Sequence, residues 1–531
     1  MKDSSQIVLG LDFGTESVRA LLVDLTGNER GSASVPFAHG QITERLPSTN
    51  AQLPSSFALQ HPADWINSAA RAVRAARRKA GVSARNVIGI GVDFTSCTVL
   101  PTKADTTPLC LLEPFSADPM AWPKLWKHSG AARQADRINA VAGQRSERFL
   151  KRYGGTVNCE WLFPKLLETL EHSPQIYRAA DLFIEAGDWV VWKLTGGEST
   201  NIPRSMCQAG YKAFWSGGDG FPSEEFFKAV HPKFAKVVSE KLYGNLIPPG
   251  VAAGELDGAM AATLGLHAGT PVSSAVIDAH AAVPGAGAAE PGTMVMVLGT
   301  SSCHMVNSHS EHYVPGIAGV VRDGILPGLY GYETGQAAVG DAFNWLGKLI
   351  GARTLVEIGA AALAMDPGAD GVRCIDWFNG CRTPLMNAGL RGSFSGLGLN
   401  HRGPHLYRAL LEATACGTRW IIDELRGGGV SVDKLIATGG LPHHMPGIIQ
   451  VYADVLRQPI MVHPSRNGSA LGSAILGALA AGAFKSPAEA IRAMSVPARG
   501  SAQTFKPVKA RSRIYDEIYA EYRKACSSAS K

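Results

Sequence analysis

Short apolar runs alternate with helix-like stretches along most of the chain. The apolar runs predict buried strands at residues 7–11, 20–23, 86–93, 293–298, 434–438 and 459–463. The helical pattern predicts helices between His61 and Gly81 and at residues 404–425, 440–457 and 469–481. Such alternation of strands and helices is typical of an α/β protein.

Two of the predicted strands end in a similar polar turn. The first runs into Asp12-Phe13-Gly14-Thr15, and the strand at 293–298 runs into Gly299-Thr300-Ser301. A carboxylate beside a Gly-Thr turn can hold hydrated Mg²⁺, while the backbone N–H groups of the turn can bind phosphate oxygens. An ordinary hairpin turn remains the alternative for either one alone. Two such turns half a chain apart indicate two related halves that face one polyphosphate.

A third glycine turn, Gly439-Gly440, follows the strand at 434–438. Two glycines let a ligand approach the backbone closely, and the helix that follows adds its positive end. Turns of this kind also join strands to helices without any ligand. The chain has no G-x-x-x-x-G-K-[ST] motif, and no G-x-G-x-x-G follows a strand, so P-loop and Rossmann sites are not supported.

With 531 residues, the chain is longer than one hydrophobic core usually supports, so two large domains are expected. A Pro- and Gly-rich stretch at 284–291 suggests the boundary between an N-terminal domain, 1–284, and a C-terminal domain, 285–531. The region at about 104–215 is rich in Trp, Pro and aromatic residues and breaks the alternation. It predicts an inserted, substrate-binding lobe.

Composition and charge narrow the classes of partner. The 51 basic and 45 acidic residues give a formal charge of +6, and the basic residues are scattered, so no nucleic-acid partner is expected. No signal peptide and no apolar run of the roughly 18 residues that a membrane span needs is recognised. The nine cysteines include no Cys-x-x-Cys pair. These features predict a cytoplasmic enzyme with no membrane partner.

The chain also resembles a known family. The segments 12–19, 299–301 and 438–440 resemble, in order and spacing, the ATP-binding elements of the actin/hexokinase/heat-shock-chaperone superfamily. Within it the chain is similar to the FGGY carbohydrate kinases over about residues 7–482. The segments that carry this similarity are 91–98, 125–128, 152–155, 160–161, 185–189, 209–213, 278–281 and 331–337.

The resemblance implies two ribonuclease-H-like (actin-like ATPase) domains with ATP and a sugar in the cleft between them. It implies that Asp12 lies near Mg²⁺. The residues implied to bind the nucleotide are Thr15, Arg19, Gly299, Thr300, Gly340, Asn344, Gly440 and His444. The residues implied to bind the sugar are Ser96, Lys212, Asp278 and Glu333, with Asp278 at the position of the general base.

These roles fit the chemistry, although simpler readings remain for each side chain. Phosphoryl transfer to a hydroxyl needs charge neutralisation and a base, and Asp278 at a strand end can accept the proton. Asp278 could instead cap a helix. Lys212 could be an exposed lysine, and Glu333 a salt-bridge partner. His280 and His304 are interpreted as packed, structural residues.

The resemblance implies MgATP-dependent phosphorylation of a ketopentose, with L-ribulose as the expected sugar. Two alternatives remain open. One is an FGGY kinase for D-ribulose, xylulose or a pentitol, and Ser96, where relatives often carry Ala, leaves sugar preference undecided. The other is an actin-fold nucleotide-binding protein that is not an enzyme, which would have no need of Lys212, Asp278 and Glu333 together. A homodimer is also expected, since FGGY kinases commonly pair.

Overall fold

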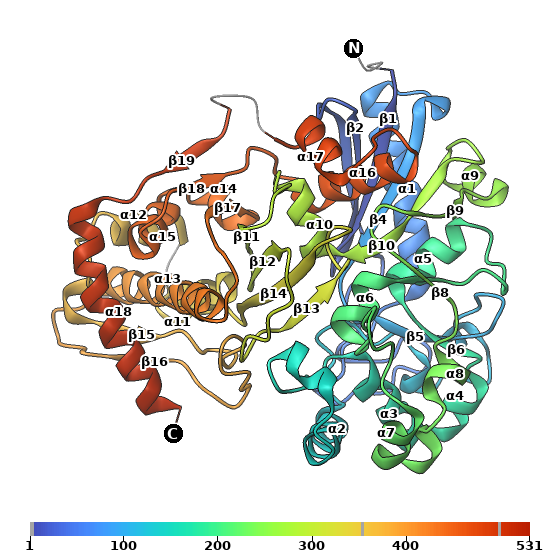
Figure 1. Ribbon diagram of the computed structural model, residues 1–531, viewed down its shortest axis with the longest axis horizontal. Coiled ribbons are helices and arrows are strands. Elements are labelled where there is room, and N and C mark those ends of the chain that lie inside the picture. Colours follow the sequence, from blue (N-terminus) through green and yellow to red (C-terminus); the bar gives the residue numbers. More distant parts are fainter. Residues whose placement is uncertain (1–4, 352–354, 497–500, 531) are drawn as a thin grey trace.

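The computed structural model describes residues 5–351, 355–496 and 501–530. Two β-sheets lie at the centres of the two sides of the molecule, with the N-terminal half of the chain on one side and most of the C-terminal half on the other (Figure 1). Helices cover both sheets, so the predicted α/β class is confirmed.

The first sheet has six strands in the order β3-β2-β1-β4-β10-β9. Their bounds are β1 Ile7–Phe13, β2 Ser17–Asp24, β3 Glu29–Pro36, β4 Val87–Phe94, β9 Ala252–Glu255 and β10 Pro271–Ile277. Strands β1, β2 and β3 form an antiparallel meander, whereas β4 and β10 run parallel to β1. The register places Asp12 of β1 directly beside Asp93 of β4.

The second sheet has seven strands in the order β13-β14-β12-β11-β17-β18-β19. Their bounds are β11 Thr293–Leu298, β12 Ser302–Ser308, β13 Gly319–Arg322, β14 Tyr330–Gln336, β17 Lys434–Thr438, β18 Ile460–Val462 and β19 Gln503–Phe505. Strands β11, β12 and β14 form an antiparallel meander, and β17 and β18 run parallel to β11. Apart from the edge strands β9, β13 and β19, the strands of the two sheets share one order and one set of directions, as expected of two related halves.

Each sheet has its own covering helices. The first core includes Trp65, Trp189 and Met260 from three helices that pack against the first sheet: α1 Pro62–Ala80, α5 Ala186–Leu194 and α9 Gly258–Leu264. The second core is built with α11 Gly340–Leu349, α12 Leu355–Leu363, α13 Gly403–Gly427, α14 Gly440–His444, α15 Gly447–Leu456 and α18 Lys509–Ala529. The helices α10 Asp278–Gly285, α16 Gly468–Ala480 and α17 Pro487–Met494 lie between the two sides (Figure 1).

Helix α16 connects the halves because its backbone lies directly on the first sheet. A Cβ atom on Gly10 would lie 1.9 Å from the Ala470 carbonyl oxygen, and one on Gly91 1.7 Å from that of Ser473. Real Cβ atoms do not approach backbone oxygens so closely, so only glycine permits this packing. Since α16 lies between β18 and β19 of the second sheet in sequence but covers the first sheet, the domain boundary near 284–291 stays a proposal.

A third hydrophobic cluster forms a lobe beside the first sheet (lower right in Figure 1). Its helices and strands are α2 Ala132–Gln144, α3 Leu162–His172, α4 Pro174–Ala179, α7 Glu224–Val230, α8 Val237–Lys241, β5 Val99–Thr102 and β6 Leu182–Glu185. Helix α6 Met206–Lys212 belongs instead to the cluster between the halves, through Cys207 and Tyr211. The short strands β7 Pro203–Ser205 and β8 Asn245–Ile247 pair with each other. The cluster also contains Ile42, Leu59 and Phe234, whereas α5 belongs to the first core. The extent of the lobe, predicted at about 104–215, therefore stays a proposal.

Most local predictions agree with the structure, and one helix differs. His61 accepts a hydrogen bond from Ala63 N and caps α1, and Gly81 ends this helix with φ 63°, as predicted. The single helix predicted at 440–457 is instead two helices, α14 and α15. The chain breaks at Pro446, because proline cannot donate the backbone hydrogen bond of a helix interior.

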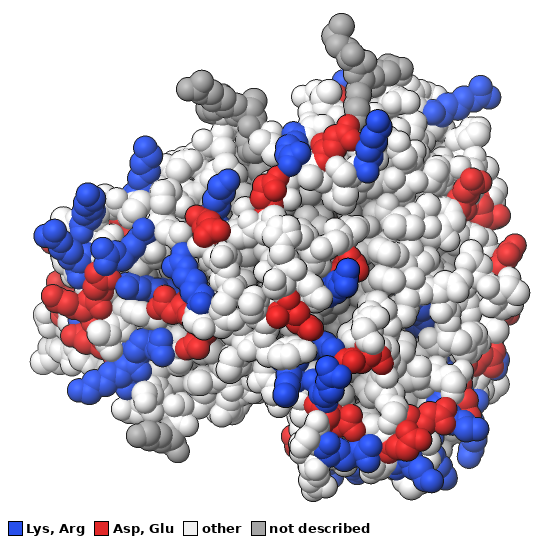
Figure 2. Space-filling view, in the orientation of Figure 1, with Lys and Arg blue, Asp and Glu red and all other residues white. Residues whose placement is uncertain are grey.

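Two surface properties bear on possible partners. In the described part of the chain, no helix is long and apolar enough to cross a membrane. On the face shown in Figure 2, basic and acidic side chains are interspersed over both halves. The short strands β15 Arg373–Ile375 and β16 Ser393–Ser395 pair with each other and flank the irregular segment 376–392.

Candidate active site

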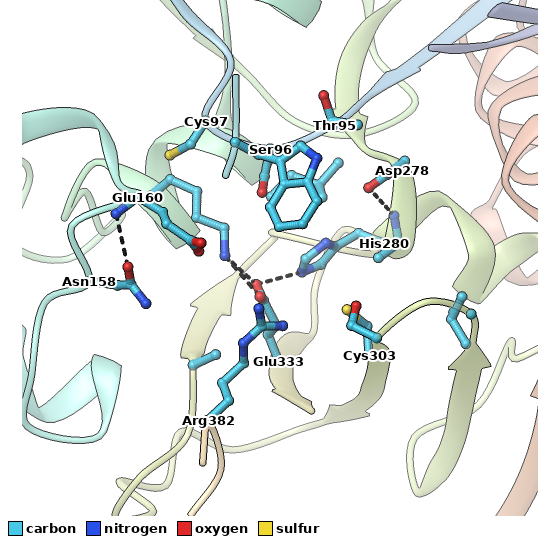
Figure 3. Close-up of a pocket in the computed structure, with 18 of the residues that line it drawn as sticks. Thr95, Ser96, Cys97, Asn158, Glu160, Asp278, His280, Cys303, Glu333 and Arg382 are labelled. Carbon is cyan, nitrogen blue, oxygen red and sulfur yellow. Dashed lines mark hydrogen bonds and ion pairs between the residues drawn. The ribbon is translucent and has the colours of Figure 1, made fainter. Parts of the chain in front are cut away.

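A cavity of about 260 Å³ opens where the two halves and the lobe meet (Figure 3). The first half and the lobe contribute Thr15, Thr95, Ser96, Cys97, Trp126, Asn158, Glu160, Trp161, Lys212, Ile277, Asp278, Ala279 and His280. The second half contributes Val297, Gly299, Thr300, Ser301, Cys303, Ala318, Glu333, Arg382, Met386 and Ser469. All four residues predicted to bind the sugar line this cavity, and so do three of those predicted to bind the nucleotide.

Lys212 and Glu333 form a buried ion pair at the cavity wall. The Lys212 Nζ atom, at the end of α6, lies 2.8 Å from Glu333 Oε1 and 2.9 Å from Oε2, on β14. His280 Nε2 lies 3.4 Å from the same carboxylate. Burial opposes ionisation of Glu333, but the Lys212 charge prevails and holds its pKa below the usual range. The reading of Lys212 as an exposed side chain is wrong.

Asp278 occupies the carboxyl end of β10, where it begins α10. Its Oδ1 atom accepts a hydrogen bond of 2.7 Å from Ala279 N (Figure 3). Burial and the nearby charge of Asp12 raise the pKa of Asp278 to about 7. A carboxyl group with this pKa can accept a proton near neutral pH, which a general base requires. Its assignment as the base stays a prediction.

Two further carboxylates lie at the ends of the neighbouring parallel strands. Asp12 Oδ2 pairs with Arg19 Nη1 at 3.1 Å, so Arg19 contacts the predicted metal ligand and is absent from the cavity lining. Asp93 is fully buried, and its Oδ2 accepts a bond of 2.5 Å from Ser473 Oγ of α16, while its Oδ1 has no hydrogen-bond partner among the described residues. Burial raises the pKa of both acids. An oxygen-rich strand edge of this kind suits Mg²⁺.

The predicted phosphate turns gather on the opposite side of the cavity. Gly299 and Thr300 follow β11, and Gly340 N donates to Gly299 O at 3.0 Å. Gly439 follows the adjacent strand β17, and a Cβ atom there would lie 2.6 Å from Leu298 O. Backbone N–H groups at such turns can bind phosphate. Three separate stretches of the second half therefore meet at one place.

The remaining predicted nucleotide residues lie outside the cavity lining. Asn344 is exposed on α11, and Gly440 and His444 are exposed on α14. Both helices start at the phosphate turns, so these residues are close in the chain to the turns, and their adenosine contacts stay a prediction. Thr15 lines the cavity, where its Oγ1 atom accepts a bond of 3.1 Å from Trp126 Nε1.

Asp93 and several residues that line the cavity had no role assigned from the sequence. The sequence does mark Asp93, because this carboxylate ends the strand predicted at 86–93. The structure places that strand beside the strand of Asp12. Glu160 and Asn158 come from the irregular chain before α3, and Arg382 from the segment between β15 and β16. Glu160 lies in segment 160–161, which carries the family resemblance, whereas no local pattern marks Asn158 or Arg382.

The two histidines have different surroundings. His280 is buried and lines the cavity, where its ring centroid lies 4.2 Å from that of Tyr211. Burial lowers its pKa, so the ring is neutral at pH 7. His304 is buried within the second half, where its Nε2 atom lies 3.2 Å from Ser302 Oγ and 3.4 Å from Thr418 Oγ1. These contacts suit a packed residue.

Comparisons with known proteins agree with this geometry. Residues 7–285 match the N-terminal domain of the FGGY family of carbohydrate kinases, and residues 294–481 match its C-terminal domain. Proteins named ribulokinase from Anoxybacillus flavithermus and Geobacillus thermodenitrificans are each 45% identical, with 97% of this chain and 93% of each relative covered. A solved xylulose kinase from Rhodospirillum rubrum has a TM-score of 0.79 at 24% identity and covers 98% of this chain and 99% of that one.

This chain belongs to the FGGY family of carbohydrate kinases. The likeness to the solved structure extends to the whole two-domain, actin-like fold, so the predicted fold is confirmed. The predicted family is likewise confirmed, and the chain is an enzyme that transfers a phosphoryl group to a sugar. Membership of a kinase family implies the use of ATP.

Proposed function

We propose that this chain phosphorylates L-ribulose with MgATP to give L-ribulose 5-phosphate. Relatives named ribulokinase, at 40–45% identity over nearly the whole chain, support this sugar. The observation that carries the proposal is the cavity, which joins the Lys212–Glu333 pair and Asp278 to the Gly299–Thr300 turn. A sugar bound there would lie between a base and a phosphate-binding turn.

The proposed roles follow from the charges and positions of the side chains. Lys212 donates to sugar hydroxyl oxygens and Glu333 accepts from hydroxyl groups, and their ion pair fixes both orientations. Asp278 accepts the proton of the attacking hydroxyl as the new P–O bond forms. Backbone N–H groups of the Gly299–Thr300 turn bind the phosphate oxygens, which gain charge during transfer.

The strand edge of Asp12 and Asp93 fits a hydrated Mg²⁺. Both groups are oxygen donors, Asp93 Oδ1 has no hydrogen-bond partner in the described part of the chain, and the basic side chain paired with Asp12 is Arg19. When bound, the ion would neutralise charge on the transferred phosphoryl group. Asp12 would hold the ion from the first half, and Arg19 would keep that carboxylate oriented.

A coupled assay of ADP release tests the proposed substrate. L-ribulose, D-ribulose, D-xylulose, a pentitol and no acceptor are compared at equal MgATP. We expect the highest kcat/KM for L-ribulose and much slower ADP release without acceptor, since kinases gain from completing their site around the sugar. A higher kcat/KM for another sugar would identify that sugar as the substrate in place of L-ribulose. ADP release that is as fast without an acceptor as with L-ribulose would contradict sugar phosphorylation. A homodimer and a cytoplasmic location belong to the same proposal, and sedimentation would test the dimer.

A further inference from the structure

Arg382 brings a cationic side chain into the cavity from the second half of the protein. Its segment is tied to β14, because Thr383 N donates to Gly335 O at 3.2 Å and Gly335 N donates to Thr383 Oγ1 at 3.3 Å. Gly335 lies two residues after Glu333, so this anchor sets Arg382 next to the predicted sugar ligands. Figure 3 shows its guanidinium directed toward the Glu333 carboxylate and the cavity.

The Arg382 guanidinium keeps donors for a ligand. Lys212 pairs directly with Glu333, but no carboxylate of the described residues forms such a pair with Arg382. Among the described residues, the side-chain partner of Arg382 is Cys303, a weak acceptor. Burial opposes the charge of this half-buried side chain, but Cys303 and the Glu160 and Glu333 carboxylates raise the pKa of Arg382 above its usual range. Since a guanidinium has five donors, most remain available in the cavity.

Arg382 and Asp278 mark two different ends of the cavity. In Figure 3, the Arg382 guanidinium lies next to the Glu333 carboxylate, whereas Asp278 lies beyond His280 on the opposite side of the cavity. In this view, Glu333 and His280 lie between the two ends. If the hydroxyl at one end of a ketopentose faces Asp278, the carbonyl end therefore lies toward Arg382.

We propose that Arg382 is a specificity residue that donates hydrogen bonds to the carbonyl oxygen of a ketose, with Glu160 accepting from the adjacent terminal hydroxyl. A carbonyl oxygen only accepts, and a guanidinium only donates, so the two match. A polyol has a hydroxyl at this carbon, whose proton also needs an acceptor. The arrangement therefore favours ketopentoses over the corresponding pentitols. This inference deepens the proposed function and rests on it.

The test compares Arg382→Gln and Arg382→Lys with the wild-type enzyme. Sugar affinity is measured without ATP from the fluorescence of Trp126 and Trp161, which line the cavity, and kcat and KM are measured for L-ribulose and L-arabitol. Loss of a charged hydrogen bond predicts about 10- to 100-fold weaker L-ribulose binding in Arg382→Gln. We expect less than about threefold change in KM for ATP and in affinity for L-arabitol. Arg382→Lys, which keeps charge but loses the planar fork, should lie between.

Arg391→Gln is the matched control, because Arg391 is an exposed arginine of the same segment, and its hydrogen bonds within the described part of the chain are to the backbone carbonyls of Ala388 and Leu390. It should bind both sugars as the wild type does. Unchanged L-ribulose affinity in Arg382→Gln, or equal losses for ketose and pentitol, would overturn the inference. If circular dichroism shows that Arg382→Gln does not fold, the test uses Arg382→Lys. Unchanged L-ribulose affinity in that variant, or equal losses for ketose and pentitol, would then overturn the inference.

The wild-type measurements separate this inference from the proposed substrate. If the wild type prefers another ketopentose, L-ribulose is wrong, and the Arg382 comparison is made with that sugar and its own pentitol. If the wild type prefers a pentitol to every ketopentose, both the proposed substrate and the role of Arg382 are contradicted.

Discussion

The two halves of the protein share the order and directions of their central strands but carry opposite chemistry at their strand ends. In the first half, the parallel strands β1, β4 and β10 end at Asp12, Asp93 and Asp278. In the second half, the equivalent strands β11 and β17 end in the turns Gly299–Thr300 and Gly439–Gly440. One half offers carboxylates, and the other offers neutral backbone donors.

This difference follows the charges of the reactants. A hydroxyl that loses its proton and a hydrated cation both need carboxylates, while a polyphosphate is repelled by them and suits backbone N–H groups. A duplicated fold thus supplies two unlike surfaces that face one cavity. The comparison predicts that changes in the first half alter chemistry and cation use, while changes at the turns of the second half alter nucleotide binding.

The largest effect is expected for Asp278→Asn. The amide keeps the size of the side chain and the acceptor for Ala279 N, but it cannot take the proton of the attacking hydroxyl. We expect kcat to fall by about 10²–10⁴-fold with ATP affinity nearly unchanged. Timed assays of sugar phosphate formation measure kcat, and equilibrium binding of ATP measures its affinity. A wild-type kcat in this variant would show that Asp278 has a purely structural role, since Asn caps helices as well as Asp does.

The pH profile tests the same residue independently. Because the pKa of Asp278 is raised to about 7 in the free protein, the base is ionised above that pH and protonated below it. The kcat/KM for the sugar should therefore rise with pH through about 7 and fall in acid. Mg²⁺ bound near Asp12 would offset the charge that helps raise this pKa. The acidic limb of the kcat profile should therefore lie at lower pH than that of the kcat/KM profile. The limb should vanish in Asp278→Asn.

Asp12→Asn should have the next largest effect and should act through the cation. Losing the carboxylate beside Arg19 removes a charge that would hold Mg²⁺, so cation affinity is expected to fall by about 10- to 100-fold. Mn²⁺ titration followed by electron paramagnetic resonance, with ADP present, measures this without turnover. Raised Mg²⁺ should recover part of the activity. Unchanged Mn²⁺ affinity together with lost sugar binding would contradict the assignment.

Gly439→Ala tests the second half. Gly439 has φ 98°, which disfavours any side chain, and a Cβ atom would lie 2.6 Å from Leu298 O. We expect the turn to shift and KM for ATP to rise by about tenfold, corresponding to about 1.4 kcal/mol, while sugar affinity is kept. Gly427→Ala is the control, because a Cβ atom there meets no atom within 4 Å. Equal losses of sugar and nucleotide affinity would contradict the division between the halves.

How far the sequence predicts this arrangement depends on whether the signal is local. The turns at Asp12 and Gly299 were found because a strand, a glycine and a hydroxyl residue follow one another directly. The break between α14 and α15 was also readable from Pro446, but the apolar pattern on both sides concealed it. Arg382 could not be found, because its place depends on pairing between Thr383 and Gly335, far apart in sequence. Likewise, α16 reaches the first sheet through glycines of both elements, which only the folded chain brings together.

The smallest expected effect is that of Ser473→Ala, which tests how α16 joins the halves. Ser473 donates a 2.5 Å hydrogen bond from α16 to buried Asp93 on β4, so its loss leaves a second oxygen of Asp93 without a partner. We expect the free energy of unfolding to fall by about 1–3 kcal/mol, as for other unsatisfied buried groups, and kcat to change less than about tenfold. Urea unfolding measures the first, and Ser528→Ala on the exposed face of α18 is the control. Loss of Mn²⁺ affinity without loss of stability would show instead that Ser473 acts on the cation site through Asp93. Equal unfolding free energies for Ser473→Ala and the wild type would mean that backbone packing at Gly10 and Gly91, rather than this bond, holds α16 on the first sheet.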